Sequence, residues 1–201
     1  MKFADAQRKM IEYLRSEDFK GREDAQDTID STHILEQIIK GGIITTQSQE
    51  GSISTGFNPD SKLYYRIEER AFITGFMTLE KAHVCMNYIN TYTDKVGFII
   101  RSEPSKEFDK EFFEGDTKAL SSIPVTVSGT SKTNTVIKKL YPFSTLQLVI
   151  PSSVVDSQKK QAHLNKSDSS VFVTVLDPVY GRKATAKNGL YKAVLDALKT
   201  T

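Results

Sequence analysis

Apolar residues recur at helical spacing in several parts of the chain. Near the N-terminus they follow one another at three- and four-residue steps, with charged residues between them, at Phe3, Ala6, Met10 and Leu14. This pattern predicts a helix over residues 3–16. Helical spacing returns after Ile29 and stops at Gly41 and Gly42, because glycine reaches the left-handed backbone conformation used just past a helix end. Further amphipathic stretches predict helices over residues 79–92, 152–164 and 190–198.

Two uninterrupted apolar runs, residues 96–100 and 171–176, are typical of interior strands that are covered on both faces. Alternating positions predict another strand over residues 64–77, one face of which holds Ile67, Glu69, Ala71 and Ile73. A predicted helix joins that strand to the 96–100 run, so the order predicts a β-α-β unit. Shorter strands are predicted over residues 43–46, 123–127 and 146–150.

Polar and turn-forming residues separate these elements. They fill residues 47–63, which we predict to be a long loop, and residues 129–134, predicted to be a second loop. Gly75 interrupts a strand, and we expect it to allow close approach of a helix or of the first loop. The sequence has no low-complexity linker that would divide it and no internal repeat. The elements therefore predict a single α/β (or α+β) domain over residues 1–201. We expect a mixed β-sheet covered by helices, two of them at the N-terminus and one at the C-terminus.

The composition suits a folded domain. The chain has 201 residues, of which 38% are hydrophobic and 26% charged, which is enough to build a core. Lys and Arg number 27 against 25 Asp and Glu, and the net charge of +2 argues against non-specific binding of nucleic acid. No apolar run approaches the roughly 20 residues that cross a bilayer, and charges stand where a signal peptide needs apolar residues. We therefore expect an intracellular (cytoplasmic) or particle-associated protein that is not secreted by a signal peptide and has no membrane segment.

The sequence offers no metal or cofactor site. Cys85 is the single cysteine, and the three histidines lie far apart, so we expect neither a metal nor a cofactor. Residues 128–133 have the composition of a phosphate-binding loop without its spacing, and we predict a flexible loop there. The acidic and aromatic stretch over residues 103–118 is either a solvated helix or turn or a helix that docks on a partner.

One polar cluster stands out. The end of the 43–46 strand presents hydroxyl and amide groups from Thr46, Gln47, Ser48 and Gln49, and such strand ends line the usual ligand crevice of an open α/β sheet. Glu69, on an apolar strand face, either pairs with an arginine or acts as the catalytic acid or base. Arg70 would hold an anionic group of the ligand. Neighbouring strand residues point to opposite faces, so Glu69 and Arg70 should act differently.

These residues also carry a resemblance. The run GIITTQSQEG at residues 42–51, followed by EERAFITGF at residues 68–76, resembles the signature of an uncharacterised domain family of actinobacterial and large-DNA-virus proteins. The resemblance covers residues 35–80 and implies no activity, because none is assigned to the family. It implies that the positions to watch are Thr46, Ser48, Gln49, Gly51, Glu69, Arg70, Gly75 and Phe76. The approach to the second motif is longer and richer in tyrosine here than in the family pattern.

Two functions of different classes are consistent with the sequence. The first is an intracellular interaction or assembly protein with an unknown protein partner, such as a particle component, which the lack of a complete catalytic motif favours. The alternative is binding of a polar small molecule or nucleotide-like ligand, with hydrolysis as its enzymatic form. Its site would be the crevice between residues 45–51 and 68–76. An open pocket around Glu69 would favour the ligand, and a filled one the scaffold.

Overall fold

The computed structural model of the chain describes residues 2–22, 26–91, 98–105, 126–131, 149–177 and 179–200. Its helices are α1 (Phe3–Arg15), α2 (Glu17–Lys20), α3 (Gln26–Ile29), α4 (Thr32–Gly41), α5 (Leu79–Thr91), α7 (Ser152–Gln161) and α8 (Leu190–Lys199). Its strands are β1 (Ile44–Gln49), β2 (Ser52–Asn58), β3 (Leu63–Glu69), β4 (Phe72–Met77), β5 (Phe98–Ser105), β6 (Thr126–Ser131), β7 (Val149–Pro151) and β8 (Val171–Leu176). This is the predicted α/β fold, with helices at both ends of the chain.

Five strands form the sheet of the body, in the order β1-β4-β8-β5-β7. All neighbours are antiparallel except β5 and β7, so the sheet is mixed, as predicted. Strands β4 and β5 are both antiparallel to β8 and hence parallel to each other, with α5 between them in sequence. The predicted β-α-β unit is therefore present, with β8 inserted between its strands. Both β8 and β5 are interior strands, although Val96 and Gly97 lie outside the described residues.

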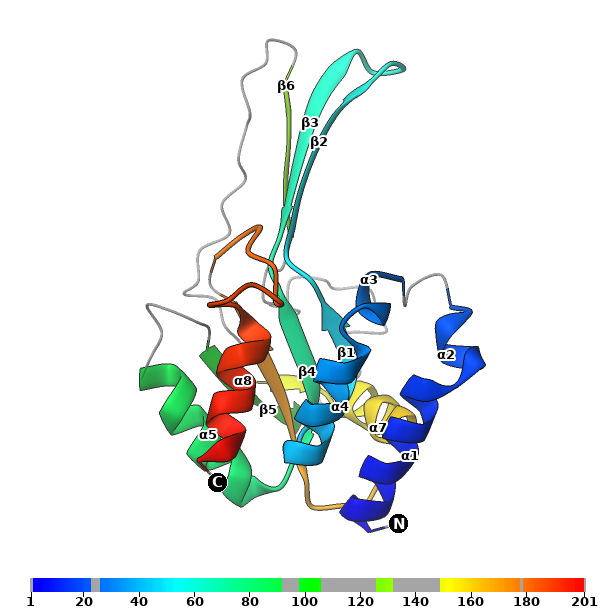
Figure 1. Cartoon of the computed structure of the whole chain (residues 1–201), viewed down its shortest axis with the longest axis vertical. Helices are drawn as coiled ribbons and strands as arrows, with labels where there is room; N and C mark the ends of the chain where they lie inside the picture. The colour runs from blue at the N-terminus through cyan, green and yellow to red at the C-terminus, as the bar shows by residue number, and fades with distance from the viewer. Residues whose placement is uncertain are drawn as a thin grey trace.

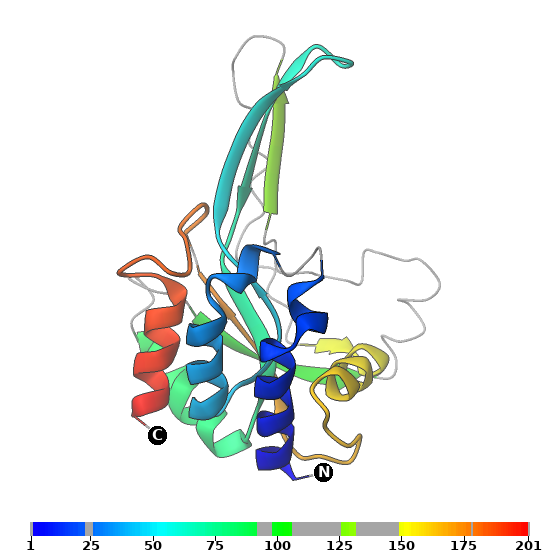
Figure 2. The ribbon, with the colours of Figure 1, turned by 45° about the vertical axis from the view of Figure 1, so that its right-hand side comes forward.

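The core lies between this sheet and its helices. Helix α8 packs on α4, α5 and β8, and α1 packs on α4 and β1, whereas α7 contacts β5 and β7 (Figures 1 and 2). The predicted apolar stripe of α1 is buried at Ala6, Met10 and Leu14. Helix α4 ends where the two glycines predict, because Gly42 has a φ of 127°. Burial of each large apolar side chain stabilises the fold by about 1.5–3 kcal/mol.

A second, three-stranded sheet projects from the body, in the order β2-β3-β6 (Figure 1). We call these strands and the turn between β2 and β3 the arm. None of the described helices lies against it in either view (Figures 1 and 2). Only Arg70 and Ala71 separate β3 in the arm from β4 in the body.

The arm corrects three of the predictions from sequence. The predicted loop over residues 47–63 instead contains the end of β1 and all of β2. Only residues 59–62 of this stretch form a turn, which connects β2 to β3. The predicted strand over residues 64–77 is two strands, β3 and β4, in different sheets. The predicted flexible loop over residues 128–133 belongs to β6 as far as Ser131, and Lys132 and Thr133 lie outside the described residues. Long-range pairing with β3 makes these polar segments strands.

The remaining elements agree with prediction where the structure describes them. Strand β8 spans residues 171–176 as predicted, α7 lies within the predicted range, and α8 begins at Leu190 as predicted and ends at Lys199, one residue beyond its predicted end. Of the predicted 146–150 strand, the structure describes residues 149 and 150, and both belong to β7. Of the acidic stretch over residues 103–118, only the part in β5 is described, so its two readings stay predictions. Among the described helices, none is long and apolar enough to span a bilayer.

Candidate functional site

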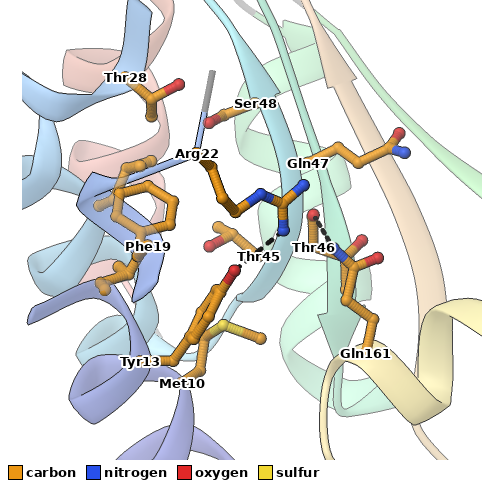
Figure 3. A pocket seen from close by; sticks show the side chains of 12 residues that line it. Met10, Tyr13, Phe19, Arg22, Thr28, Thr45, Thr46, Gln47, Ser48 and Gln161 are labelled. Atoms are coloured by element: carbon orange, nitrogen blue, oxygen red, sulfur yellow. Dashed lines mark hydrogen bonds between the residues drawn. The ribbon is translucent and has the colours of Figure 1, made fainter. Parts of the chain in front are cut away.

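Three of the predicted ligand-binding residues line one pocket, which we call the β1 pocket (Figure 3). Thr46, Gln47 and Ser48 form its β1 side, where a register shift between Thr45 and Gln47 makes the strand irregular. The opposite wall is formed by side chains from the four N-terminal helices and the residues that follow α2, and from α7. These are Met10, Tyr13, Leu14, Phe19, Arg22, Thr28, Leu35 and Gln161. The pocket has a volume of about 170 Å³.

Hydrogen bonds fix the walls of the β1 pocket. Arg22 Nη1 donates to the Tyr13 hydroxyl at 2.9 Å, and Gln161 Nε2 donates to the Thr46 carbonyl at 3.0 Å (Figure 3). The Thr46 hydroxyl lies 3.4 Å from the hydroxyl of Thr74 on β4. The bond from Gln161 to Thr46 joins α7 to β1, and these two residues are 115 positions apart in the sequence. The pocket therefore depends on how the ends of the chain pack together.

The β1 pocket is suited to an anionic group. The lining residues that the structure describes include Arg22 and no aspartate or glutamate. A neighbouring hollow of about 380 Å³ shares Tyr13, Arg22 and Gln161 with the pocket and adds Ser157, Lys160 and His163. Its described lining also contains no carboxylate. An arginine, a lysine and several neutral donors together favour phosphate or carboxylate over a cation.

The structure places Glu69 elsewhere. Its carboxylate accepts a hydrogen bond from the Ser52 hydroxyl at 2.6 Å, across the β2–β3 pair. With Asp30, Glu50 and Lys183 it lines a separate hollow of about 420 Å³ at the base of the arm. Glu69 is half-buried, and its neighbours Glu68 and Arg70 are the buried ones. The space around Glu69 is thus open, which is the outcome that favours a ligand, but this hollow and the β1 pocket are separate sites.

Arg70 is part of the junction between arm and body. Its side chain is only 3% exposed, and its guanidinium lies 3.9 Å from the centre of the Tyr180 ring. Burial lowers the pKa of Arg70, and the negative charge of Asp177 opposes that shift. Gln49, the fifth predicted ligand-binding residue, has a buried Nε2 with no hydrogen-bond partner among the described residues. Neither side chain lines the β1 pocket.

Residues 177 and 179–184, which follow β8, hold the base of the arm, and we call them the clasp. Arg182 makes two hydrogen bonds to the buried carboxylate of Asp177, at 2.6 and 2.7 Å. The backbone N–H of Asp177 donates to Ala71, and that of Gly181 donates to Glu69. Gly51 lets the backbone at Arg182 approach, because a Cβ there would lie 2.0 Å from the Arg182 oxygen. Sequence reasoning missed the clasp, although a charged residue directly after a buried strand was a usable signal.

Glu50 ties the start of the arm to the body. Its carboxylate accepts hydrogen bonds from the Ser31 hydroxyl at 3.1 Å and from the backbone N–H of Ala184 at 2.8 Å. Nearby, the Tyr191 hydroxyl is buried, and burial together with the charge of Glu50 raises the pKa of that phenol. These contacts hold the β1–β2 connection in one position.

The arm exposes large apolar side chains. Of seven such exposed residues among those described, four lie on β2 and β3, namely Ile53, Phe57, Tyr64 and Tyr65. Phe57 and Tyr64 are 50% and 48% exposed and pair directly across the hairpin, with ring centres 5.0 Å apart. The register places Ile53 on the same face, because it is two and four residues from Thr55 and Phe57 along β2. Arg66 and Glu68, 2.6 Å apart, lie between these apolar residues on that face.

Neither a metal site among the described residues nor a related protein indicates a reaction or a ligand. Among the described residues, no group of three or more His, Cys, Asp or Glu side chains could hold a metal ion. No model of a known protein family matches the chain, and no curated protein matches it. The resemblance over residues 35–80 therefore stays an expectation.

Proposed function

We propose that this protein is an interaction or assembly protein, inside a cell or within a particle, and that the arm is the surface through which it binds another protein chain. The exposed Phe57–Tyr64 pair is the observation that carries this proposal. Two large aromatic side chains held half in water have no role in the core of the described structure. Clusters of exposed aromatic and aliphatic side chains mark protein-binding surfaces.

The base of the arm supports the same function. A binding surface gains affinity when it is held in its bound arrangement beforehand. The clasp, Glu50 and Arg70 bind the first and last residues of the β2–β3 hairpin to the body through buried polar contacts. Among the described residues, a network of buried polar contacts therefore fixes the position of the arm.

A photo-crosslinker tests this proposal. p-Benzoylphenylalanine is placed at Phe57, and in a control protein at Leu79, which is also exposed, at 44%, but lies at the start of α5 on the body. Each full-length protein is irradiated alone and in an extract of cells that make it, and adducts are identified by mass spectrometry. We expect protein adducts from position 57 and none above background from position 79. Position 57 giving no adduct under either condition would contradict the proposal.

A second candidate function is binding of a polar small molecule with an anionic group, such as a nucleotide-like ligand, in the β1 pocket. The described linings of the β1 pocket and of the neighbouring hollow, which include Arg22, Lys160 and His163, contain no carboxylate, and this favours it. In this proposal Arg22 takes the anion-holding role that the sequence assigns to Arg70. Phe19 and Met10 supply an apolar wall for the rest of the ligand. A hydrolytic version would need a general base, and Glu69 lines a different hollow.

Thermal shift measurements with inorganic phosphate and with a nucleoside monophosphate test this second function. Saturating ligand should raise Tm, because a ligand at 100 times its Kd stabilises the fold by about 2.7 kcal/mol. Arg22→Gln should remove the rise. The matched control, Arg8→Gln, changes an exposed arginine of α1 that does not line the β1 pocket and should keep it. No rise with either ligand would leave the β1 pocket without a role in binding anions.

A further inference from the structure

In the described sheet β2 is an edge strand, and Gly181 of the clasp packs on Ile53 near its start. Strand β2 occupies one side of the arm, with β3 between it and β6 (Figure 1). Among the described residues, no backbone hydrogen bond from outside the arm reaches residues 52–58. Natural edge strands are normally guarded by lysine, other charges, proline or a bulge, because unpaired N–H and C=O groups bind further strands. The sequence of β2, SISTGFN, has no charged residue and no proline, and its pairing with β3 is regular over all seven positions.

We propose that two copies of this chain bind each other through β2, antiparallel, about a two-fold axis at Thr55. The two arms then form one continuous sheet of six strands. This inference rests on the proposed function and names the partner as a second copy. Pairing by strand addition supplies backbone hydrogen bonds without a deep groove, and it suits an exposed strand of polar residues.

The midpoint of β2 sets the register. Only pairing centred on Thr55 gives every one of the seven residues a partner on the same face of the joined sheet. Ile53 then lies opposite Phe57 of the second copy, and Ser54 lies opposite its Gly56. Within each arm Phe57 already pairs with Tyr64. Across the joined sheet, Ile53 of one copy is therefore followed by Phe57 and then Tyr64 of the other copy. Exposed apolar side chains thus meet one another, and such cross-strand pairs contribute about 0.2–1 kcal/mol each.

Charge also allows this pairing. None of the seven residue pairs places like charges opposite each other, because β2 is uncharged. The nearest cation, Arg66, lies beside Thr55 on β3 and is neutralised by Glu68 at 2.6 Å. The antiparallel direction sends the two bodies to opposite ends of the joined sheet, since each body adjoins the Ser52 end of its own β2 (Figures 1 and 2). The two bodies therefore lie apart, and the turn of each arm reaches the base of the other arm. One strand pair of seven residue pairs makes a small interface, so we expect a reversible, concentration-dependent dimer.

Disulfide trapping tests both the dimer and its register. In full-length Thr55→Cys the two new thiols lie directly opposite, about 4.5–5.5 Å apart at Cβ, whereas in the control Ser54→Cys they are diagonal, about 7–8 Å apart, too far for a disulfide. The background is low because Cys85 is buried, and burial raises its pKa to about 11. We expect mild oxidation to link Thr55→Cys into dimers and to leave Ser54→Cys and the unchanged protein monomeric. Linkage of both variants to the same extent, or of neither, would overturn the register.

Sedimentation velocity over a range of protein concentrations gives an independent measurement. Thr55→Arg places two like charges opposite each other and should shift the protein to monomer. Ser54→Arg adds the same charge to the same strand on the other face, opposite glycine, and should keep the dimer. A protein that is monomeric at all concentrations, with Thr55→Cys not linked, overturns the pairing of two copies. If position 57 still forms photo-adducts with other proteins, the proposed function survives that result, so the two failures are distinguishable.

Discussion

Arg182 holds the carboxylate of Asp177 with two hydrogen bonds, Nε to Oδ2 at 2.6 Å and Nη2 to Oδ1 at 2.7 Å. Asp177 is 0% exposed and follows the last residue of β8, so this pair fixes the clasp to the central strand of the body. Asp177 Oδ1 also accepts the backbone N–H of Val179 at 2.8 Å. The pair thereby connects the body to the base of the arm.

Removing the cation of this pair should destabilise the protein strongly. Arg182→Gln removes the cation that is hydrogen-bonded to the buried Asp177 carboxylate and leaves Arg70 as its neighbouring positive charge, so we expect a loss of about 3 kcal/mol. The control is Lys192→Gln, which breaks the exposed Lys192–Asp196 pair on α8 and should cost less than about 0.5 kcal/mol. Urea denaturation of both variants measures the difference. Equal, small losses would show that the clasp does not stabilise the fold.

Glu69 and Arg70 should differ in their effect on stability. Arg70→Ala removes a buried guanidinium and its contact with the Tyr180 ring, and we expect a loss of about 2–4 kcal/mol. Glu69→Gln keeps the shape of a half-buried side chain that accepts one hydrogen bond from Ser52, and we expect a loss of about 1 kcal/mol or less. The free energy of unfolding of each variant decides this. A larger loss for Glu69→Gln would reverse the assignment of the two positions.

The body could be predicted from sequence, and the arm could not. Periodicity identifies an element when one face or both faces are buried, and this holds for α1, α8 and β8. Both faces of β2 are largely exposed, so its residues show no alternation and look like a loop. Its extended conformation comes from hydrogen bonds to β3. Counting by two along residues 64–77 failed for a related reason, because the chain passes from one sheet to another at Arg70 and Ala71.

The candidate site was predictable only within one segment. Thr46, Gln47 and Ser48 are consecutive, and the structure does place them beside one pocket. The residues that give this pocket its charge and its far wall, Arg22 and Gln161, come from distant parts of the chain. Their approach depends on the packing of α1 and α7, which no local pattern shows.

Gly75 should tolerate no side chain. A Cβ at this position would lie 2.3 Å from the carbonyl oxygen of Ile44, so the close approach is made by strand β1 at Ile44 and Thr45, and not by a helix or by the 47–63 segment as predicted from the sequence. Gly75→Val should therefore lower the free energy of unfolding by about 1–3 kcal/mol or more through overpacking. Gly21→Ala is the control, because its Cβ would meet only the Glu17 oxygen, at 3.2 Å. Thermal denaturation that gives both variants the Tm of the unchanged protein would refute the close approach.

The packing of α1 on α4 should weaken in acid. Arg15 donates to both carboxylate oxygens of Glu36 at 2.7 and 2.5 Å, and these hydrogen bonds, with the positive charge, hold the pKa of Glu36 below its ordinary value of 4.5. A lowered pKa means that the pair stabilises the fold above pH 4.5 and that this contribution is lost as the pH falls through the folded-state value. Glu36→Gln should therefore show a shallower loss of stability below pH 4.5 than the unchanged protein. The control Glu12→Gln removes an exposed carboxylate of α1 and should lose stability with falling pH as the unchanged protein does. If Glu36→Gln also loses stability as the unchanged protein does, the Arg15–Glu36 pair is not the source of the acid sensitivity.

In the proposed assembly, two copies of the chain meet along β2 of the arm. Hydrogen–deuterium exchange of the unchanged protein, measured in dilute and in concentrated solution, tests it most directly. We predict that exchange of peptides covering residues 52–58 slows as the concentration rises, because strand pairing protects backbone N–H groups that are otherwise free at the edge. Peptides covering residues 171–176, in the centre of the body sheet, should exchange at the same slow rate in both solutions. Exchange of residues 52–58 that is independent of concentration would contradict the account.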